Sequence, residues 1–369
     1  MLSKRHHRSQ RVAVAIVLAG AVTAACGDSA ATGGDAGSGD DATWQFRVND
    51  YNPPTHAFVT HGWEPFAEEV TEATDGRVTF DIFPSEGLGK VSDTLSALDS
   101  GAVDMASTIS GFHPEAMQIM QSTVAVGFEN AALGTQAMWE LCQMDPFKAE
   151  FEKNDVVPIF CLATPPYDLL LGDDEINGIP DAFDGLRLRA TGLQIEILEL
   201  MGASPTSMSS TEIYTAVQQG TIDGTTMGWY TLPAFSFDEI IDHATRGLES
   251  WQAGIMFFGM STSTWEELPE DVQTVMIDAG KRYSLEIANE LDRQGEEAYE
   301  ANKNAMRIHT VTEEERAQVA EVIDKALADW VVAMESAGLG AEANAATEAL
   351  RAVRDIEEKP VDEWAEFGY

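Results

Sequence analysis

The first part of the folded chain alternates between two hydrophobic periods. Trp44–Asn49 and Val78–Phe83 change between apolar and polar at every second residue, as half-buried strands do. Between them, apolar residues from Phe58 to Val70 recur at helical spacing. A helix over about 91–100 and a strand over 103–108 continue the series. This order predicts βαβ units and a mainly parallel sheet.

The later pattern predicts more helices and one break between two groups of elements. Helical stretches cover about 134–154, and a strand at 156–163 ends at the break Thr164-Pro165-Pro166. A return from the second group to the first is expected near 251–260. Residues 269–306 form one helical pattern, which predicts a helix about 55 Å long. Two further helices are expected after it, to about residue 358.

Arg189 lies at the end of a short strand predicted at Leu186–Ala190. Side chains alternate along a strand, so Arg187 and Arg189 share one face. In open α/β sheets ligands bind beyond the carboxyl ends of strands, and the N-terminus of a following helix attracts anions. A guanidinium also offers paired donors that match a carboxylate. Arg189 is therefore a candidate carboxylate anchor; an ordinary surface salt bridge is the alternative.

Two helices are expected directly after this strand. Thr191 is the predicted N-cap of the first helix, which ends at Gly202. Ser210-Thr211 is the predicted cap of the second helix, which ends at Gly220.

The charge of the chain narrows its possible partners. The 369 residues suffice for two domains of ordinary size. The formal net charge is −40, with 62 Asp and Glu against 22 Lys and Arg. Such a chain cannot form the basic patch that nucleic acid requires, so nucleic acid is excluded as a partner. One interpretation of this negative charge is that the protein works in a salt-rich habitat. The alternative is that the charge only keeps the protein soluble.

The N-terminus has the pattern of a secretory signal over residues 1–25. Four basic residues precede a short apolar stretch, Val12–Val22, and small residues then lead to Cys26. This pattern resembles a lipobox and predicts that Cys26 is lipidated and anchors the protein to the membrane; a plain signal peptide is the alternative. Residues 26–43 lack apolar periodicity and indicate a flexible tether. No transmembrane helix is expected beyond the signal.

Two cysteines remain after Cys26 is assigned to the lipid. Cys142 and Cys161 form an even pair in an exported chain, where disulfides are stable. We therefore predict a disulfide between them; two buried free thiols are the alternative.

The sequence has no recognisable enzymatic or metal-binding motif. It lacks a nucleophile elbow, a C-x-x-C pair, an H-E-x-x-H helix, a P-loop and a dinucleotide fingerprint. The histidines after the signal form no pair at i, i+4 spacing, so no metal site is expected. We predict a protein that is not an enzyme and needs no cofactor.

Four segments carry a resemblance to a known family. They are GRVTFDIFPSEGLGK at 76–90, ALDSGAVDMA at 97–106, GLRLRATG at 185–192 and GASPTSMSSTEIYTAVQQGTIDG at 202–224. In this order and spacing they resemble the solute-binding proteins of tripartite ATP-independent periplasmic (TRAP) transporters, of the dicarboxylate-receptor type. The resemblance covers roughly residues 44–335.

The resemblance implies an α/β fold with two lobes, as in periplasmic binding proteins, and a long helix that spans both. The first lobe is predicted at residues 44–165 with 255–290, and the second at 166–254 with 291–369. The resemblance also implies that Arg189 clamps the substrate carboxylate, and that a membrane permease is the partner.

The resemblance suggests which residues line the cleft. Compared with sialic-acid-binding members, this chain has Ile109 and Phe112 in place of charged residues after the third strand. After the later Asp223-Gly224 turn it has Met227, with Trp229 nearby, in place of an Asn. A buried charge without a partner is costly, so we expect a monocarboxylate with an apolar or aromatic body. The alternative is that these side chains only fill the core. The other candidate ligand-binding residues are Asn49, Tyr51, Tyr167 and Ser210, with His56 as a weaker one.

The sequence therefore predicts an extracytoplasmic solute-binding protein, in the periplasm or at the outer face of the cell membrane. It would capture a small organic acid by lobe closure and deliver it to a permease. A sensor-type binding protein that presents its ligand to a receptor is the alternative.

Overall fold

The computed structural model describes residues 42–249, 251, 253–354 and 356–366. The predicted signal, Cys26 and nearly all of the tether lie outside the described residues. The chain from Asp41 onward forms one compact unit. Within the described ranges, none of the helices combines the length and apolarity needed to cross a membrane.

The first sheet has five strands in the order β2-β1-β3-β10-β4. β1 (Trp44–Asn49) is parallel to β2 (Val78–Phe83) and β3 (Met105–Ile109). β10 (Met256–Ser261) is antiparallel to both β3 and β4 (Val156–Leu162). The prediction of a mainly parallel sheet is therefore wrong at β10, because this strand returns from the second half of the chain and not through a βαβ crossover.

The second sheet has six strands in the order β11-β9-β5-β8-β6-β7. It is also mixed, because β5 runs antiparallel to β8 and β9 whereas the other pairs are parallel. Each strand has only three or four residues, too few for a period of two to stand out in the sequence. The strands are β5 (Asp168–Leu171), β6 (Arg187–Arg189), β7 (Ser204–Thr206), β8 (Gly224–Met227), β9 (His243–Arg246) and β11 (Arg307–Thr310).

Aromatic rings form the core on one side of the first sheet. Phe58–Trp63 is a π-helical segment that continues into α1 (Glu64–Ala73). Trp63 stacks on Phe258 of β10 with ring centroids 4.6 Å apart, and Phe160 of β4 lies at the same distance from Phe258. These rings bury the apolar face that the sequence pattern from Phe58 to Val70 predicts.

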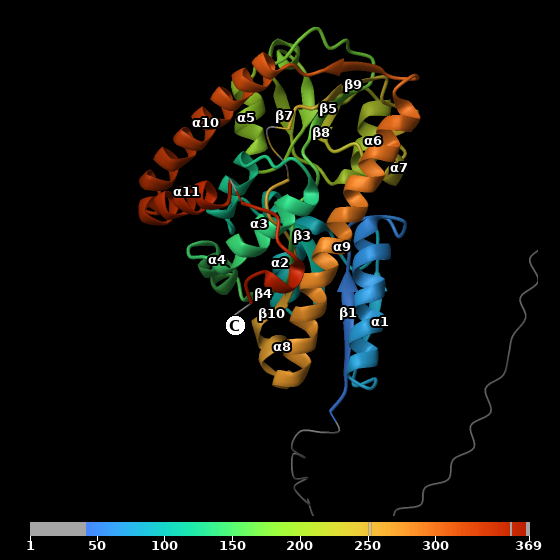
Figure 1. Ribbon diagram of the computed structural model, residues 1–369, viewed down its shortest axis with the longest axis vertical. Coiled ribbons are helices and arrows are strands. Elements are labelled where there is room, and N and C mark those ends of the chain that lie inside the picture. The colour runs from blue at the N-terminus through green and yellow to red at the C-terminus, as the bar shows by residue number, and fades with distance from the viewer. Residues whose placement is uncertain (1–41, 250, 252, 355, 367–369) are drawn as a thin grey trace, which may run out of the picture. The chain divides into compact units, whose positions relative to one another are not determined.

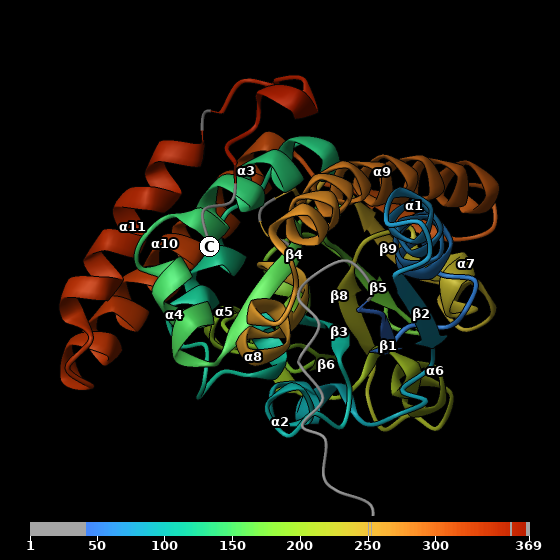
Figure 2. The ribbon, with the colours of Figure 1, turned by 90° about the horizontal axis from the view of Figure 1, so that it is seen from below.

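One long helix runs past both sheets. α9 (Glu270–Asn302) has 33 residues, about 50 Å at 1.5 Å per residue. It packs on β4, α1 and α3 (Ala131–Gln143) and extends to the second sheet (Figures 1 and 2). In its last turns, Tyr299 contacts Trp229, which follows the second-sheet strand β8. Gly280 allows the close packing, since a Cβ there would collide with the carbonyl oxygen of Ile159. The predicted two-lobe α/β architecture with a long helix is confirmed.

The C-terminal helices touch elements beside both sheets. α10 (Glu313–Ser336) packs on α5 (Gln194–Leu200), and α11 (Gly340–Arg354) packs on α3. The lobe boundaries given above stay a prediction. The remaining α-helices are α2 (Thr94–Asp99), α4 (Phe147–Lys153), α6 (Ser210–Gln218), α7 (Thr231–Ala234) and α8 (Thr262–Glu266).

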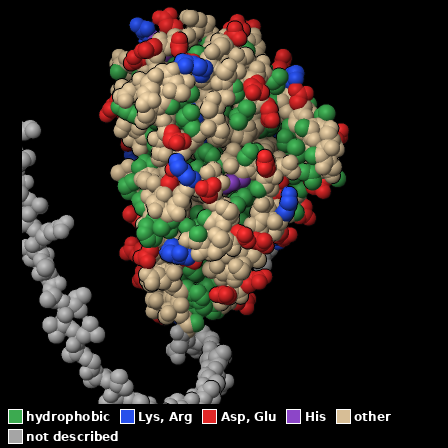
Figure 3. Space-filling view, turned by 180° about the vertical axis from the view of Figure 1, so that it is seen from behind, with side chains coloured by type: hydrophobic (Ala, Val, Ile, Leu, Met, Phe, Trp, Pro, Cys, Tyr) green, Lys and Arg blue, Asp and Glu red, His purple; other side chains and the backbone are tan. Residues whose placement is uncertain are grey.

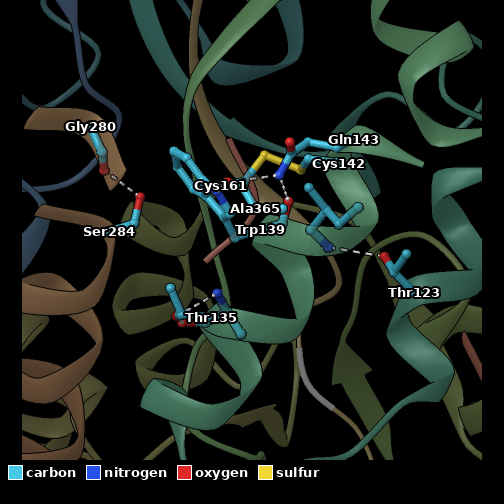
Figure 4. Close-up of a disulfide and its surroundings, with 11 residues drawn as sticks. Thr123, Thr135, Trp139, Cys142, Gln143, Cys161, Gly280, Ser284 and Ala365 are labelled. Atoms are coloured by element: carbon cyan, nitrogen blue, oxygen red, sulfur yellow. Dashed lines mark hydrogen bonds between the residues drawn. A yellow bond between two sulfur atoms is a disulfide. The ribbon is translucent and has the colours of Figure 1, made fainter. Parts of the chain in front are cut away.

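A disulfide joins α3 to β4. Cys142 and Cys161 are bonded and fully buried (Figure 4). A second link lies nearby, where Thr135 Oγ1 accepts a hydrogen bond of 3.1 Å from the backbone N–H of Ala163. The helix is therefore fastened at two points to the end of β4, an edge strand of the first sheet.

The surface reflects the acidic composition. Asp and Glu side chains are spread over the face shown in Figure 3, with Lys and Arg scattered among them. This distribution fits the exclusion of nucleic acid as a partner.

Candidate functional site

A small cavity lies where the strand ends of the two sheets meet. β1, β3, β6 and β8 end at Asn49, Ile109, Arg189 and Met227, and ligands of α/β proteins bind at such carboxyl ends. The cavity measures only about 10 Å³. Its lining from the first sheet and its loops is Tyr51, Asn52, His56, Phe58, Ile109 and Met256, and from the second sheet Tyr167, Arg189, Ser210, Met227, Tyr230 and Phe235.

Arg189 brings a buried positive charge to this cavity. Its side chain is 1% exposed, and Nε donates a hydrogen bond of 3.1 Å to the carbonyl oxygen of Met208. None of the ion pairs among the described residues includes Arg189, whereas Arg187 on the same strand pairs with Asp223. The two arginines therefore differ in role: Arg187 has a surface carboxylate partner and Arg189 does not.

Aromatic groups surround the guanidinium of Arg189. Burial lowers the pKa of Arg189, and the nearby phenols of Tyr167, Tyr51 and Tyr230 act in the opposite direction. Arginine nevertheless stays charged in proteins. The ring of Phe112 lies 5.6 Å from Cζ, within range of a cation–π contact. The cavity thus holds a permanent charge whose burial no carboxylate of the described chain offsets.

The three tyrosines of the cavity are neutral hydrogen-bonding groups. Burial raises the pKa of Tyr51, Tyr167 and Tyr230 above the ordinary value. Their phenols therefore stay protonated at neutral pH and can donate to an anion near Arg189.

His56 lies among the apolar walls of the cavity. Its Nδ1 accepts a hydrogen bond of 3.2 Å from the backbone N–H of Phe58, and its ring packs against Phe58 and Phe235. Burial lowers the pKa of His56 to about 3, so the ring is neutral at physiological pH.

Phe112 lines a second, larger cavity and contacts two residues of the small one. Its ring contacts Tyr51 at 5.9 Å and lies near Arg189, and it also lines a cavity of about 400 Å³. That cavity continues between Gln121 and Trp330.

The first of the two helices after Arg189, α5, begins later than predicted, and the second, α6, begins slightly earlier. α5 starts at Gln194, and Thr191 is not its N-cap, because Gly192 takes a left-handed φ of +57° and delays the helix. The helix N-terminus therefore does not directly follow Arg189. α6 starts at Ser210, and its cap is Ser209, which forms a capping box with Glu212. Ser210 itself lines the cavity.

Two predicted site residues lie elsewhere. Asn49 holds the loop after β2, because its Nδ2 donates to the Gly89 carbonyl at 3.1 Å and its Oδ1 accepts from the N–H of Leu88 at 3.0 Å. Trp229 donates from Nε1 to Asp168 Oδ2 at 3.0 Å and lines a different cavity of about 220 Å³. β8 ends at Met227, so strand alternation does not carry Trp229 to the side of Met227.

The structure brings together most of the other candidates. Tyr51, Tyr167, Ser210 and Met227 line the cavity with Arg189, and Phe112 contacts Tyr51 and Arg189. Sequence reasoning missed several lining residues that carry no motif. These are Asn52, Phe58, Tyr230, Phe235 and Met256.

A family model matches most of the chain. The model for bacterial extracellular solute-binding protein family 7 matches residues 49–332. A solute-binding protein of Roseobacter denitrificans is 31% identical over 222 residues, which is 58% of this chain and 65% of that protein. The C4-dicarboxylate-binding periplasmic protein of Rhodobacter capsulatus is 27% identical over 270 residues, 71% of this chain and 79% of its own. The chain thus spans less than two thirds of the Roseobacter relative.

Solved structures share the fold at low sequence identity. A TRAP solute-binding protein from Rhodoferax ferrireducens, with benzoate, has a TM-score of 0.77 and 19% identity, over 85% of this chain and 98% of that one. A TRAP periplasmic solute-binding protein from Bordetella bronchiseptica, with mandelate, has a TM-score of 0.75 and 22% identity. The match covers 84% of this chain and 98% of the Bordetella chain.

Proposed function

Since the chain belongs to family 7 of the bacterial extracellular solute-binding proteins, the binding proteins of TRAP transporters, we propose that it captures a small monocarboxylate with an apolar or aromatic body. The family is a transport family and not an enzyme family. One observation carries the proposal: Arg189 is a buried charge without a carboxylate partner, in a cavity lined otherwise by aromatic and apolar side chains.

The charge of Arg189 favours an anionic group on the ligand. Moving an ion out of water is costly unless a partner of opposite charge compensates for it. A ligand carboxylate would supply that partner and could accept two hydrogen bonds from the guanidinium. Tyr51, Tyr167 and Tyr230 would offer further donors to the same carboxylate.

The rest of the lining favours an apolar body. Phe58, Ile109, Met227 and Met256 offer no charge to a second carboxylate, so a dicarboxylate would bury one charge without compensation. The complexes of the Rhodoferax protein with benzoate and of the Bordetella protein with mandelate support an aromatic acid.

The size of the cavity implies that its walls move. A space of about 10 Å³ holds at most one water molecule, whereas a benzene ring needs about 150 Å³. Because the lining comes from both sheets, separation of the two would open the site. We therefore propose that the acid enters an open state and shifts the population toward a closed one by binding it more tightly.

Export and delivery form the second part of the proposal. We propose that residues 1–25 direct export, that Cys26 is lipidated, and that the closed protein delivers its ligand to a TRAP permease. Mass spectrometry of the protein from membranes tests the lipid: an acylated N-terminal Cys26 is expected. An unmodified N-terminus would contradict the anchor and leave ligand binding untouched.

Calorimetry of the purified protein tests the binding site. We expect benzoate to bind, and benzamide, which has the same shape without the charge, to bind far more weakly. Arg189→Met should abolish benzoate binding, while the matched variant Arg187→Met should keep it. Equal binding of benzoate by both variants would overturn the role of Arg189.

A further inference from the structure

The hydrogen bonds of His56 fix where its single ring proton lies. Nδ1 accepts the backbone N–H of Phe58 at 3.2 Å, so Nδ1 carries a lone pair and no proton. The ring is neutral, since burial keeps its pKa near 3. The proton therefore sits on Nε2, which makes Nε2–H a hydrogen-bond donor.

This donor has no acceptor within the described chain. His56 is 2% exposed, and among the residues that the structure describes no oxygen or nitrogen accepts a hydrogen bond from Nε2. The neighbours of the ring are aromatic: Phe58, Phe235 and Tyr230, with centroids 4.5, 5.8 and 6.0 Å away. His56 lines the same cavity as Arg189, so its donor is available to a ligand in that cavity, and a ligand that filled the cavity without an acceptor would leave the donor unpaired.

We propose that His56 is a specificity-determining residue and that the ligand carries a second oxygen, a hydroxyl, keto or ether group remote from the carboxylate, which accepts a hydrogen bond from Nε2–H. This inference rests on the proposed function, because it assumes that the carboxylate lies at Arg189. It narrows the ligand from any apolar monocarboxylate to an oxygen-substituted one.

The positions of the two residues also couple recognition to closure. His56 follows β1 of the first sheet, whereas Arg189 ends β6 of the second. A ligand that binds both His56 and Arg189 would link the two sheets directly. An acid without the second oxygen would reach the first sheet by a polar contact only through the phenol of Tyr51, and it would leave Nε2–H unpaired in the closed state.

Calorimetry with benzoate and its 2-, 3- and 4-hydroxy derivatives tests the inference on the mature protein. At least one hydroxy isomer should bind about tenfold or more tightly than benzoate. In His56→Phe this preference should vanish, so that benzoate and its hydroxy derivatives bind that variant with similar affinities. His56→Gln, which restores an N–H donor, should recover part of the preference. His61→Phe, an exposed histidine of the same segment, is the matched control and should keep it.

The outcomes separate the two proposals. Binding of benzoate with no preference for any hydroxy isomer would overturn the role of His56 and leave the carboxylate site standing. A preference that persists in His56→Phe would also overturn it. Failure of every acid to bind the wild-type protein would overturn the proposed function itself. If His56→Phe does not fold, nitrogen-15 NMR of wild-type His56 decides: a protonated Nδ1 would contradict the inference.

Discussion

Gly111 and Thr191 meet across the boundary between the two sheets. A Cβ atom built on Gly111 would lie 2.9 Å from Thr191 Oγ1 and 3.1 Å from Thr191 Cβ. Gly111 follows β3 of the first sheet, and Thr191 follows β6 of the second. The segments that follow β3 and β6 therefore lie so close together that a methyl group on Gly111 would collide with the side chain of Thr191.

Gly111→Ala should weaken ligand binding by hindering this approach. The added methyl group has no room in the closed arrangement, and overpacking of this kind costs about 1–3 kcal/mol. We expect an increase in Kd for benzoate of about five- to a hundredfold, measured by calorimetry. An open arrangement has no such contact, so the melting temperature without ligand should change little.

Gly89→Ala is the matched control for this variant. Gly89 lies in the loop after β2, has no left-handed φ, and a Cβ there would meet nothing within 4 Å. Its Kd should match that of the wild type. An unchanged Kd in Gly111→Ala would mean that binding does not need the close approach of Gly111 to Thr191.

Arg189→Met should raise the stability of the protein in the absence of ligand. The variant replaces a buried charge, which no carboxylate of the described chain pairs, by an apolar side chain of similar length. Replacing a buried ion pair by apolar side chains of similar volume is often neutral or stabilises a protein by on the order of 1–4 kcal/mol, and we expect the same direction for this unpaired charge. Denaturant unfolding measures the difference. A less stable Arg189→Met would show that Arg189 supports the fold through contacts such as that with Met208.

Most long elements could be predicted from the sequence. β1 and β2 have the bounds that the alternation indicated, and α9 differs from its predicted range by a few residues. These segments repeat a period often enough to be distinguished. The strands of three or four residues, such as β7 and β11, contain too few repeats, and β10 pairs with partners far away in the sequence.

The candidate site could be predicted only where a motif or a strand end marks it. Arg189 was found because it ends a strand in a recognisable segment. Trp229 lies at a different cavity from Met227, because β8 ends at Met227 and the end of a strand has no periodic signal in the sequence. Tyr230, Phe235 and Met256 were missed because an aromatic or sulfur-containing residue in a cavity wall looks like any core residue in the sequence.

The disulfide between Cys142 and Cys161 should stabilise the protein under oxidising conditions. It closes a loop between residues 19 positions apart, and loops of this length give about 3 kcal/mol in the chain-entropy model. The double variant Cys142→Ala/Cys161→Ala should lose about that amount in urea unfolding. Addition of a reductant should lower the free energy of unfolding of the wild type toward that of the variant. If Cys142 and Cys161 both react with a thiol reagent in the unfolded wild type without reductant, the disulfide does not exist.

Asp168 is a buried carboxylate near the junction of the two sheets. Its Oδ1 accepts hydrogen bonds from Thr245 Oγ1 at 2.8 Å and the N–H of Leu248 at 3.2 Å, and its Oδ2 accepts from Trp229 Nε1 at 3.0 Å. These bonds favour the charged form, but burial outweighs them and raises the pKa of Asp168 to about 6. Arg246 acts in the same direction as the hydrogen bonds.

The raised pKa of Asp168 should make stability fall as pH increases. The folded protein holds this proton more tightly than the unfolded chain, so the contribution to stability is fully present below the unfolded pKa near 4. It is lost as pH rises through about 6. The free energy of unfolding of the wild type relative to Asp168→Asn should therefore fall by about 2 kcal/mol from pH 4.5 to pH 7.5. Asp223→Asn is the control, because hydrogen bonds from Arg187 outweigh partial burial and lower the pKa of Asp223. Its contribution to stability is present above the unfolded pKa near 4 and is lost only at lower pH, so the difference between the wild type and Asp223→Asn should stay nearly constant from pH 4.5 to pH 7.5. Urea unfolding across this pH range measures both differences, and parallel curves for the wild type and Asp168→Asn would show that Asp168 is ionised in the folded protein throughout.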